Sequence, residues 1–178
     1  MFGRFFGFMK PSNKQESTQE KEVIPGTTLT YDKTLVIQLH NDHKALLVLY
    51  SKIGKYLEKE DYPNIQSHLA QFATLLRTHL LLENLKLYVY LTKALAHDAE
   101  NLELMIGMRK EMGHIGRTVN QFLTRYTETL PWTPEKTQSF AGEFKHIGKI
   151  LVERISREEQ RLYTLYMPPS SYSTIILD

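Results

Sequence analysis

The sequence predicts an all-α fold, an up-and-down four-helix bundle. Three observations lead to this fold class. Apolar residues recur every three or four positions over four long segments. Capping residues and prolines separate these segments at regular intervals, and patterns typical of strands are essentially absent. The connections are short, so neighbouring helices should lie antiparallel.

Helix-capping residues set the bounds of the four predicted helices. Their expected N-terminal caps are Asp32, Asp61, Asp98 and Thr133. Their expected ends are near Lys59, near His97, before Pro131 and at Pro168. A proline follows the second and the fourth cap within the first turn, a position that proline favours.

A chain of 178 residues fits one domain with a sizeable core. We expect a flexible N-terminal segment at 1–26, the bundle at 27–168 and a C-terminal tail at 169–178. The first segment carries four phenylalanines among glycines and basic residues, namely Phe2, Phe5, Phe6 and Phe8. Two interpretations stay open for it: a disordered start, or a weak contact with a membrane surface or a partner protein.

Composition excludes several classes of function. The formal net charge of +2 gives no indication of nucleic-acid binding. The absence of cysteine excludes disulfides, thiolate metal sites and cysteine nucleophiles, and it is compatible with a reducing cytoplasm, where we expect the protein. No apolar run has the length needed to cross a bilayer.

Polar residues interrupt the apolar stripes of three predicted helices. They are His43, His79, Glu83, Arg154 and Glu158. Burying a carboxylate or a guanidinium costs several kcal/mol unless it is paired or bound to a metal. Counting residues along antiparallel helices places all five at a similar depth, with Met112 as the contribution of the third helix. The stripes therefore predict one common polar cluster.

His79 and Glu83 form the sharpest single motif. Four residues apart on a helix, they project from the same face, as two ligands of one cation must.

Three segments together resemble the hemerythrin-like, or HHE cation-binding, family. They are Asn41 to Leu46, His79 to Tyr88 and Ser156 to Tyr163. The resemblance implies a di-iron or other metal centre, with His43, His79, Glu83 and Glu158 at ligand positions. Met112 and Arg154 stand where the family has histidines, and His114 is a possible extra ligand if the third helix is rotated. Methionine suits oxygen-preferring iron poorly, and guanidinium does not ligate.

Two arrangements of the altered centre stay open. In the first, Arg154 pairs with Glu158 and Glu83, and the two histidines hydrogen-bond around them. In the second, His43, His79, Glu83 and Glu158 hold one cation. The core tyrosines are expected to direct their hydroxyls to the edge of the bundle, namely Tyr50, Tyr88, Tyr90, Tyr126 and Tyr163.

Two functional hypotheses follow from the altered centre. The first is a non-enzymatic regulatory or protein-binding module, because bacterial anti-sigma regulators without metal share the fold. The second is a cation sensor or store, or an oxygen-binding protein, with iron as the expected metal. The cofactor is thus expected to be absent or to be a metal ion at reduced occupancy. No enzyme is expected, because no nucleophile with an adjacent base, phosphate-binding loop or open acid pair is found.

Overall fold

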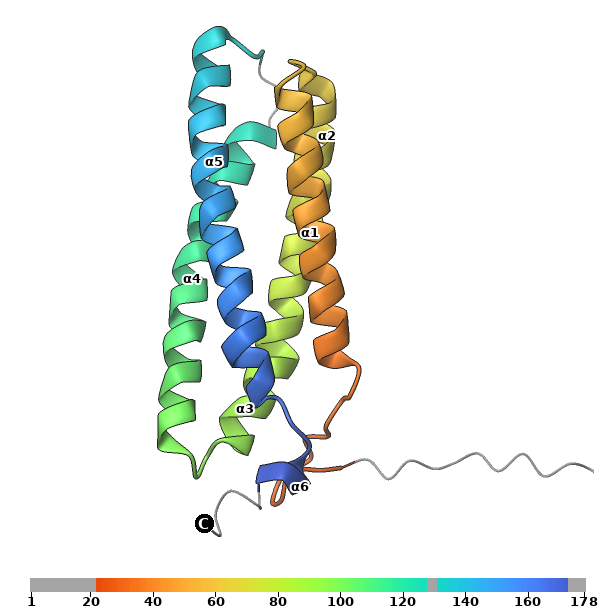
Figure 1. Ribbon diagram of the computed structural model, residues 1–178, viewed down its shortest axis with the longest axis vertical. Helices are drawn as coiled ribbons and strands as arrows, with labels where there is room; N and C mark the ends of the chain where they lie inside the picture. Colours follow the sequence, from red (N-terminus) through yellow and green to blue (C-terminus); the bar gives the residue numbers. More distant parts are fainter. Residues whose placement is uncertain (1–21, 128–130, 173–178) are drawn as a thin grey trace, which may run out of the picture.

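Four long helices run side by side in the computed structural model, which describes residues 22–127 and 131–172 (Figure 1). They are α1 (Leu35–Leu57), α2 (Tyr62–Leu82), α4 (Ala99–Thr127) and α5 (Pro134–Arg157). The shorter helical segments are η1 (Glu83–Leu87), α3 (Tyr88–Ala94), η2 (Glu158–Leu162), η3 (Tyr163–Leu165) and α6 (Pro169–Tyr172). Within the described ranges, strand pairing is limited to one isolated bridge between Val23 and Thr30. The all-α prediction is confirmed.

Three of the expected N-terminal caps are present. Asp61 accepts a hydrogen bond from the backbone N–H of Asn64 at 3.3 Å, and Asp98 accepts one from Asn101 at 3.1 Å. The Thr133 hydroxyl accepts one from Lys136 at 3.2 Å. Each bond satisfies an N–H that has no partner within the helix itself, which stabilises a helix by about 1 kcal/mol.

The start of α1 differs from the prediction. The helix begins at Leu35, and Asp32 instead accepts hydrogen bonds from the backbone and hydroxyl of Thr34. Asp32 therefore closes a turn just ahead of the helix, and the cap lies two residues later than expected.

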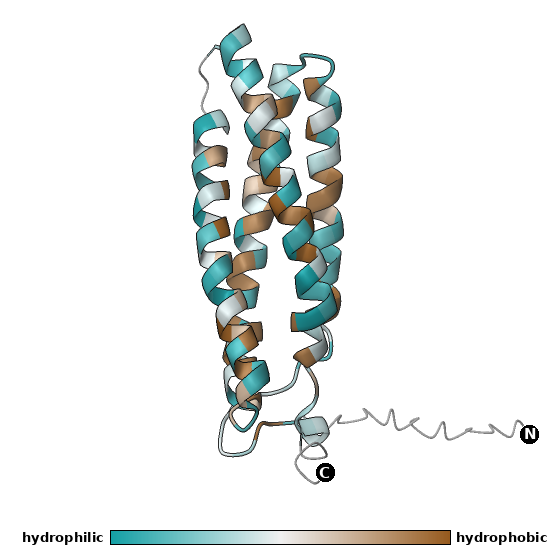
Figure 2. Ribbon diagram, turned by 60° about the vertical axis from the view of Figure 1, so that its left-hand side comes forward, coloured by the Kyte–Doolittle hydropathy of each residue, from teal (hydrophilic) through white to brown (hydrophobic). Residues whose placement is uncertain are grey.

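Two hydrophobic cores lie at opposite ends of the bundle, separated by the polar residues. Brown, hydrophobic residues recur along the long helices among teal, hydrophilic ones (Figure 2). On α1, Leu39 belongs to one core and Leu46 to the other, with His43 between them. On α5 and η2, Leu151 and Leu162 likewise flank the polar positions. The interruptions seen in the sequence thus form one layer across the bundle.

Two π-helical turns interrupt the helices beside this layer. The second predicted helix is not continuous to His97, because η1 begins at Glu83 and the following helix ends at Ala94. In the same way, η2 begins at Glu158. An α-helix turns about 100° per residue, so a residue five positions on lies about 140° away. A π-turn bonds residue i to residue i+5 and brings that residue back over the same face.

The residue after each π-turn is a tyrosine, and both tyrosines are buried. Tyr88 follows η1 and Tyr163 follows η2, with 1 % and 4 % of their surfaces exposed. The π-turns therefore direct two large polar side chains into the bundle at the level of the polar layer.

The folded unit is wider than the expected span of 27–168. Ile24 is 6 % exposed and packs in the core near α3, and Val23 pairs with Thr30. At the other end, Tyr172 in α6 accepts a hydrogen bond from the backbone of Met167 at 3.1 Å. Residues on both sides of the expected boundaries thus pack against the bundle.

No helix in the described ranges combines the length and apolar character that crossing a bilayer requires. The four N-terminal phenylalanines lie outside the described residues.

Candidate metal centre

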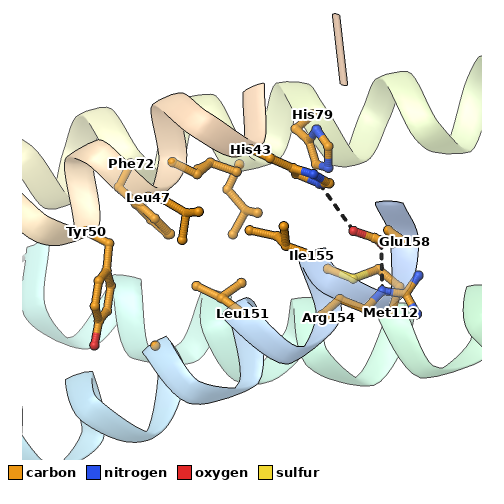
Figure 3. A pocket seen from close by; sticks show the side chains of 13 residues that line it. His43, Leu47, Tyr50, Phe72, His79, Met112, Leu151, Arg154, Ile155 and Glu158 are labelled. Carbon is orange, nitrogen blue, oxygen red and sulfur yellow. Dashed lines mark hydrogen bonds and ion pairs between the residues drawn. The ribbon is translucent and has the colours of Figure 1, made fainter. Parts of the chain in front are cut away.

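The polar layer brings together all five polar residues that the sequence placed on core positions. Their exposed fractions are 1 % for His43, 2 % for His79, 0 % for Glu83, 1 % for Arg154 and 2 % for Glu158. Figure 3 shows His43 and His79 facing Glu158, with Arg154 and Met112 beyond it. Since each helix contributes at a matching depth, the antiparallel residue count predicted the layer correctly.

One half of the layer gathers potential cation ligands. Ligand atoms of His43, His79 and Glu158 all lie within 4.8 Å of one another. His43 Nε2 lies 3.3 Å from Glu158 Oε2, and His79 Nε2 lies 3.8 Å from Glu83 Oε1. Two imidazoles and a carboxylate at this spacing suit a transition-metal ion.

The second nitrogen of each imidazole faces an acidic residue outside the layer. His43 Nδ1 is hydrogen-bonded to Glu159 Oε1 at 2.9 Å. His79 Nδ1 lies 3.6 Å from Asp42 Oδ2, too far for a hydrogen bond. Metal-binding histidines commonly have a carboxylate at the other ring nitrogen, which sets the orientation and tautomer of the ring. Both rings therefore present Nε2 to the interior, as metal ligands would.

Arg154 dominates the other half of the layer. Its guanidinium donates to Glu158 at 2.6 Å, to Tyr88 at 3.1 Å and to Glu111 at 3.3 Å. The expected pairing with Glu158 is present. The expected pairing with Glu83 is not, because Glu111 of α4 provides the second carboxylate from the edge of the bundle.

Glu83 has a different partner, the hydroxyl of Tyr163. This hydroxyl donates to Glu83 Oε1 at 3.0 Å and lies 3.2 Å from His43 Nε2. The expectation that core tyrosines reach the bundle edge is therefore wrong for Tyr163 and for Tyr88, whose hydroxyls point into the layer. Tyr50 is half-buried, and its hydroxyl donates to the backbone oxygen of Phe144 at 3.1 Å.

Two sets of residues of the same construction build the layer and its edge, and each set contributes to both the histidine half and the arginine half. Each set contains two adjacent residues on one helix, the first of which is acidic. It also contains two residues four positions apart on the following helix, and the tyrosine that comes directly after the π-turn. The two sets are Asp42, His43, His79, Glu83 and Tyr88, and Glu111, Met112, Arg154, Glu158 and Tyr163. Asp42 lies near His79 as Glu111 lies near Arg154. The repeated pattern Glu-x-x-x-Leu-Tyr at 83–88 and 158–163 was the signal that would have identified both tyrosines.

Burial and neighbouring charges shift the pKa values of the layer in opposite directions. Burial and the charge of Glu158 raise the pKa of Glu83 to about 8. Burial and the charge of His43 lower the pKa of His79 to about 4. Burial opposes ionisation of Glu158 as well, but His43 and Arg154 outweigh it and hold its pKa below the ordinary value. Burial opposes protonation of His43, yet its bonds to Glu158 and Glu159 raise its pKa.

His114 does not join the layer. It is exposed and hydrogen-bonds to Arg117 at 2.7 Å on the outer face of α4. The helix is not rotated in the way that ligation by His114 would need. His40, one helical turn before His43, lies 3.1 Å from Glu159 and forms a second, half-exposed cluster with it and His43.

The residues present fit one cation better than two. Glu83 Oε2 and His79 Nδ1 are buried without hydrogen-bond partners, so the histidine half has unused polar capacity. In the arginine half, the side chains at the two remaining ligand positions are a thioether and a guanidinium, neither of which suits iron. A cavity of about 20 Å³ beside the layer, with an almost wholly apolar lining, holds no more than a water-sized molecule (Figure 3).

A comparison with protein families matches residues 34–166 to the hemerythrin HHE cation-binding domain. Searches of curated proteins and of solved structures gave no match. The family match covers most of the chain and includes every helix that contributes to the layer. Together with the four-helix bundle and its buried His/Glu layer, it shows that this chain belongs to the hemerythrin HHE cation-binding domain family.

Proposed function

We propose that this domain is a non-enzymatic regulatory module whose altered centre holds at most one cation. The observation that carries the proposal is the position of Arg154, whose buried guanidinium bonds to Glu158, Glu111 and Tyr88. It supplies one half of the layer with a permanent positive charge.

A buried guanidinium differs chemically from the metal ion that the family's centre would hold at this position. It stays protonated in proteins, and it has no lone pair with which to bind a metal ion. It also pairs with Glu158, one of the carboxylates that a second cation would need. These properties favour a centre without paired metal ions, and hence without the chemistry that depends on such a pair.

The histidine half would hold the single cation through His43, His79 and Glu158, with Glu83 adjacent. When bound, the cation would supply positive charge to a buried carboxylate layer and link α1, α2 and η2. Binding would therefore draw three elements of the bundle together. In this way a local binding event can shift the conformational equilibrium of the whole domain.

The non-enzymatic part of the proposal is supported by the small size of the cavity that His43, His79 and Glu158 line. The cavity at the layer measures only about 20 Å³ and is lined mainly by apolar side chains. Small-molecule sites are usually more than ten times larger.

A cation sensor or store is the second candidate function. The favouring observation is that His43 belongs both to the buried cluster and to a half-exposed cluster with His40 and Glu159. These two clusters would give a cation a ligand-lined route from the surface to the layer.

Metal analysis of protein purified without chelator tests the stoichiometry. We expect at most one metal ion per chain after loading with Fe²⁺, Mn²⁺ or Zn²⁺ under reducing conditions. His79→Ala should abolish binding, whereas His114→Ala, a histidine of the same helix bundle outside the layer, should not. Two ions per chain in the unmodified protein would contradict the proposal.

Comparison of partners tests the regulatory role. Unmodified protein loaded with a cation and metal-free His79→Ala should retain different proteins in parallel affinity purifications. Identical sets of retained proteins would refute regulation by the cation.

A further inference from the structure

Tyr163 lies at the meeting point of the potential cation ligands. Its hydroxyl oxygen is 3.0 Å from Glu83 Oε1 and 3.2 Å from His43 Nε2. Its ring stacks on the His43 ring with centroids 5.5 Å apart and planes inclined by 12°. Only 4 % of the residue is exposed, so its hydroxyl is committed to the layer.

The equivalent tyrosine in the other half already contacts a cation. Tyr88 accepts a hydrogen bond from the Arg154 guanidinium at 3.1 Å. The two tyrosines follow equivalent π-turns and occupy equivalent positions in the repeated pattern at 83–88 and 158–163. The same construction therefore presents a phenol oxygen to positive charge in one half, and to the proposed cation position in the other.

We propose that Tyr163 is a direct oxygen ligand of the cation, beside His43, His79 and Glu158. This inference rests on the single-cation centre proposed above. A phenolate is a hard anionic donor, so it favours a hard, highly charged ion such as Fe³⁺ over a softer one. The preferred occupant is thus a trivalent cation.

The proton balance of this step needs no further group of the protein. On binding, a bond between the Tyr163 oxygen and the cation would replace the phenolic O–H bond, and the proton would be released to solvent, as metal binding to a protonated ligand requires. No electron would be transferred. Glu83 Oε1, 3.0 Å from the hydroxyl, orients the phenol oxygen before the cation binds.

The test loads metal-free protein with Fe³⁺ supplied as ferric nitrilotriacetate. The unmodified protein should bind one iron per chain and show a visible phenolate-to-iron charge-transfer band, with tyrosinate vibrations in its resonance Raman spectrum. Tyr163→Phe should lose the band completely. Tyr88→Phe removes the equivalent hydroxyl from the arginine half and should keep the band.

The possible results separate this inference from the proposal on which it rests. One iron per chain without a charge-transfer band would overturn ligation by Tyr163 and leave the single-cation centre intact. A band that persists in Tyr163→Phe would also overturn it. Failure of the unmodified protein to bind any cation would overturn both proposals.

A measurement on the unmodified protein covers the case in which Tyr163→Phe fails to fold. Ga³⁺ resembles Fe³⁺ but is not reduced, and its binding should produce the ultraviolet difference spectrum of one phenolate per chain. Gallium binding without a phenolate signal would refute ligation by Tyr163.

Discussion

Replacing Arg154 by methionine is the most direct test of how the layer is stabilised. The two side chains have similar length, so the substitution removes charge and hydrogen bonds while keeping much of the volume. It takes away the donors to Glu158, Glu111 and Tyr88 at once. Glu158, with 2 % of its surface exposed, would then keep His43, 3.3 Å away, as its ion-pair partner.

The expected loss of stability is large for a single substitution. Removing one partner of a buried ion pair costs about 3–5 kcal/mol, because the remaining charge has lost both water and its counter-ion. For a domain of this size, a loss of this order lowers the unfolding temperature by about 6–20 °C.

The loss should depend on pH. In the unmodified protein the pKa of Glu158 lies below its ordinary value of 4.5, so its ionisation contributes stability above pH 4.5, and this contribution disappears as the pH falls through the folded-state pKa. Without Arg154 the pKa of Glu158 rises, and acid then relieves the variant's penalty. The stability difference between the two proteins should therefore be greatest at neutral pH and shrink on acidification toward and below pH 4.5.

Urea denaturation at neutral and acidic pH, with chelator present throughout, measures this difference. Arg157→Met is the matched control, because Arg157 also bonds to Glu111 but its side chain is 46 % exposed. Exposed pairs contribute about 0–1 kcal/mol, so the control should lose little. Equal losses in the two variants, or a loss that does not change with pH, would show that the Arg154 charge does not stabilise the layer.

Three further predictions concern packing, the N-terminal boundary and the ligand set. Gly148→Ala should cost about 1–3 kcal/mol in a denaturation experiment, because a Cβ there would lie 2.0 Å from the Tyr50 hydroxyl. A chain that begins at residue 27 should be less stable than one that begins at residue 22 by about 1.5–3 kcal/mol, since residues 22–26 include a buried isoleucine. Met112→His combined with Arg154→His should raise the iron content, measured under reducing conditions, from at most one ion per chain toward two.

Each of these predictions has its own control. Gly142→Ala introduces a Cβ with no atom within 4 Å and should be close to neutral, and Tyr50→Leu should rescue Gly148→Ala. Equal stability of the chains beginning at 22 and 27 would show that Ile24 contributes nothing. For the ligand set, Arg154→His alone should raise the iron content more than Met112→His alone does, because it also removes the guanidinium that pairs with Glu158. Unchanged iron content in the double variant would contradict the reasoning.

The sequence predicted the fold class and the polar layer because both depend on strong, local signals. The 3.6-residue period fixes which face of each helix is buried, and capping residues fix where most helices begin. Polar residues such as Arg154 and His79 stood out because leaving them on a core face is costly unless they share a site.

The partners within the layer were harder to predict because they depend on helix geometry that residue counting does not contain. A count based on an ideal α-helix places Tyr88 and Tyr163 away from Glu83 and Glu158, whereas the π-turns bring them to the same face. The same count carried no information on which carboxylate would reach Arg154. Glu111, from the edge of α4, took the place expected for Glu83.

The proposed regulation by a cation requires a module that remains folded with and without the ion, and the structure of the layer is compatible with this requirement. If both halves depended on metal, removing it would leave several buried carboxylates without any counter-ion, at a cost of several kcal/mol. Arg154 provides a counter-ion that never dissociates and holds Glu158 in place through a 2.6 Å bond. The fold would then depend on the arginine half, while the histidine half would be free to bind or release the proposed ion. Under the proposed function, the arginine that occupies one metal position would therefore also allow the other position to act as a switch.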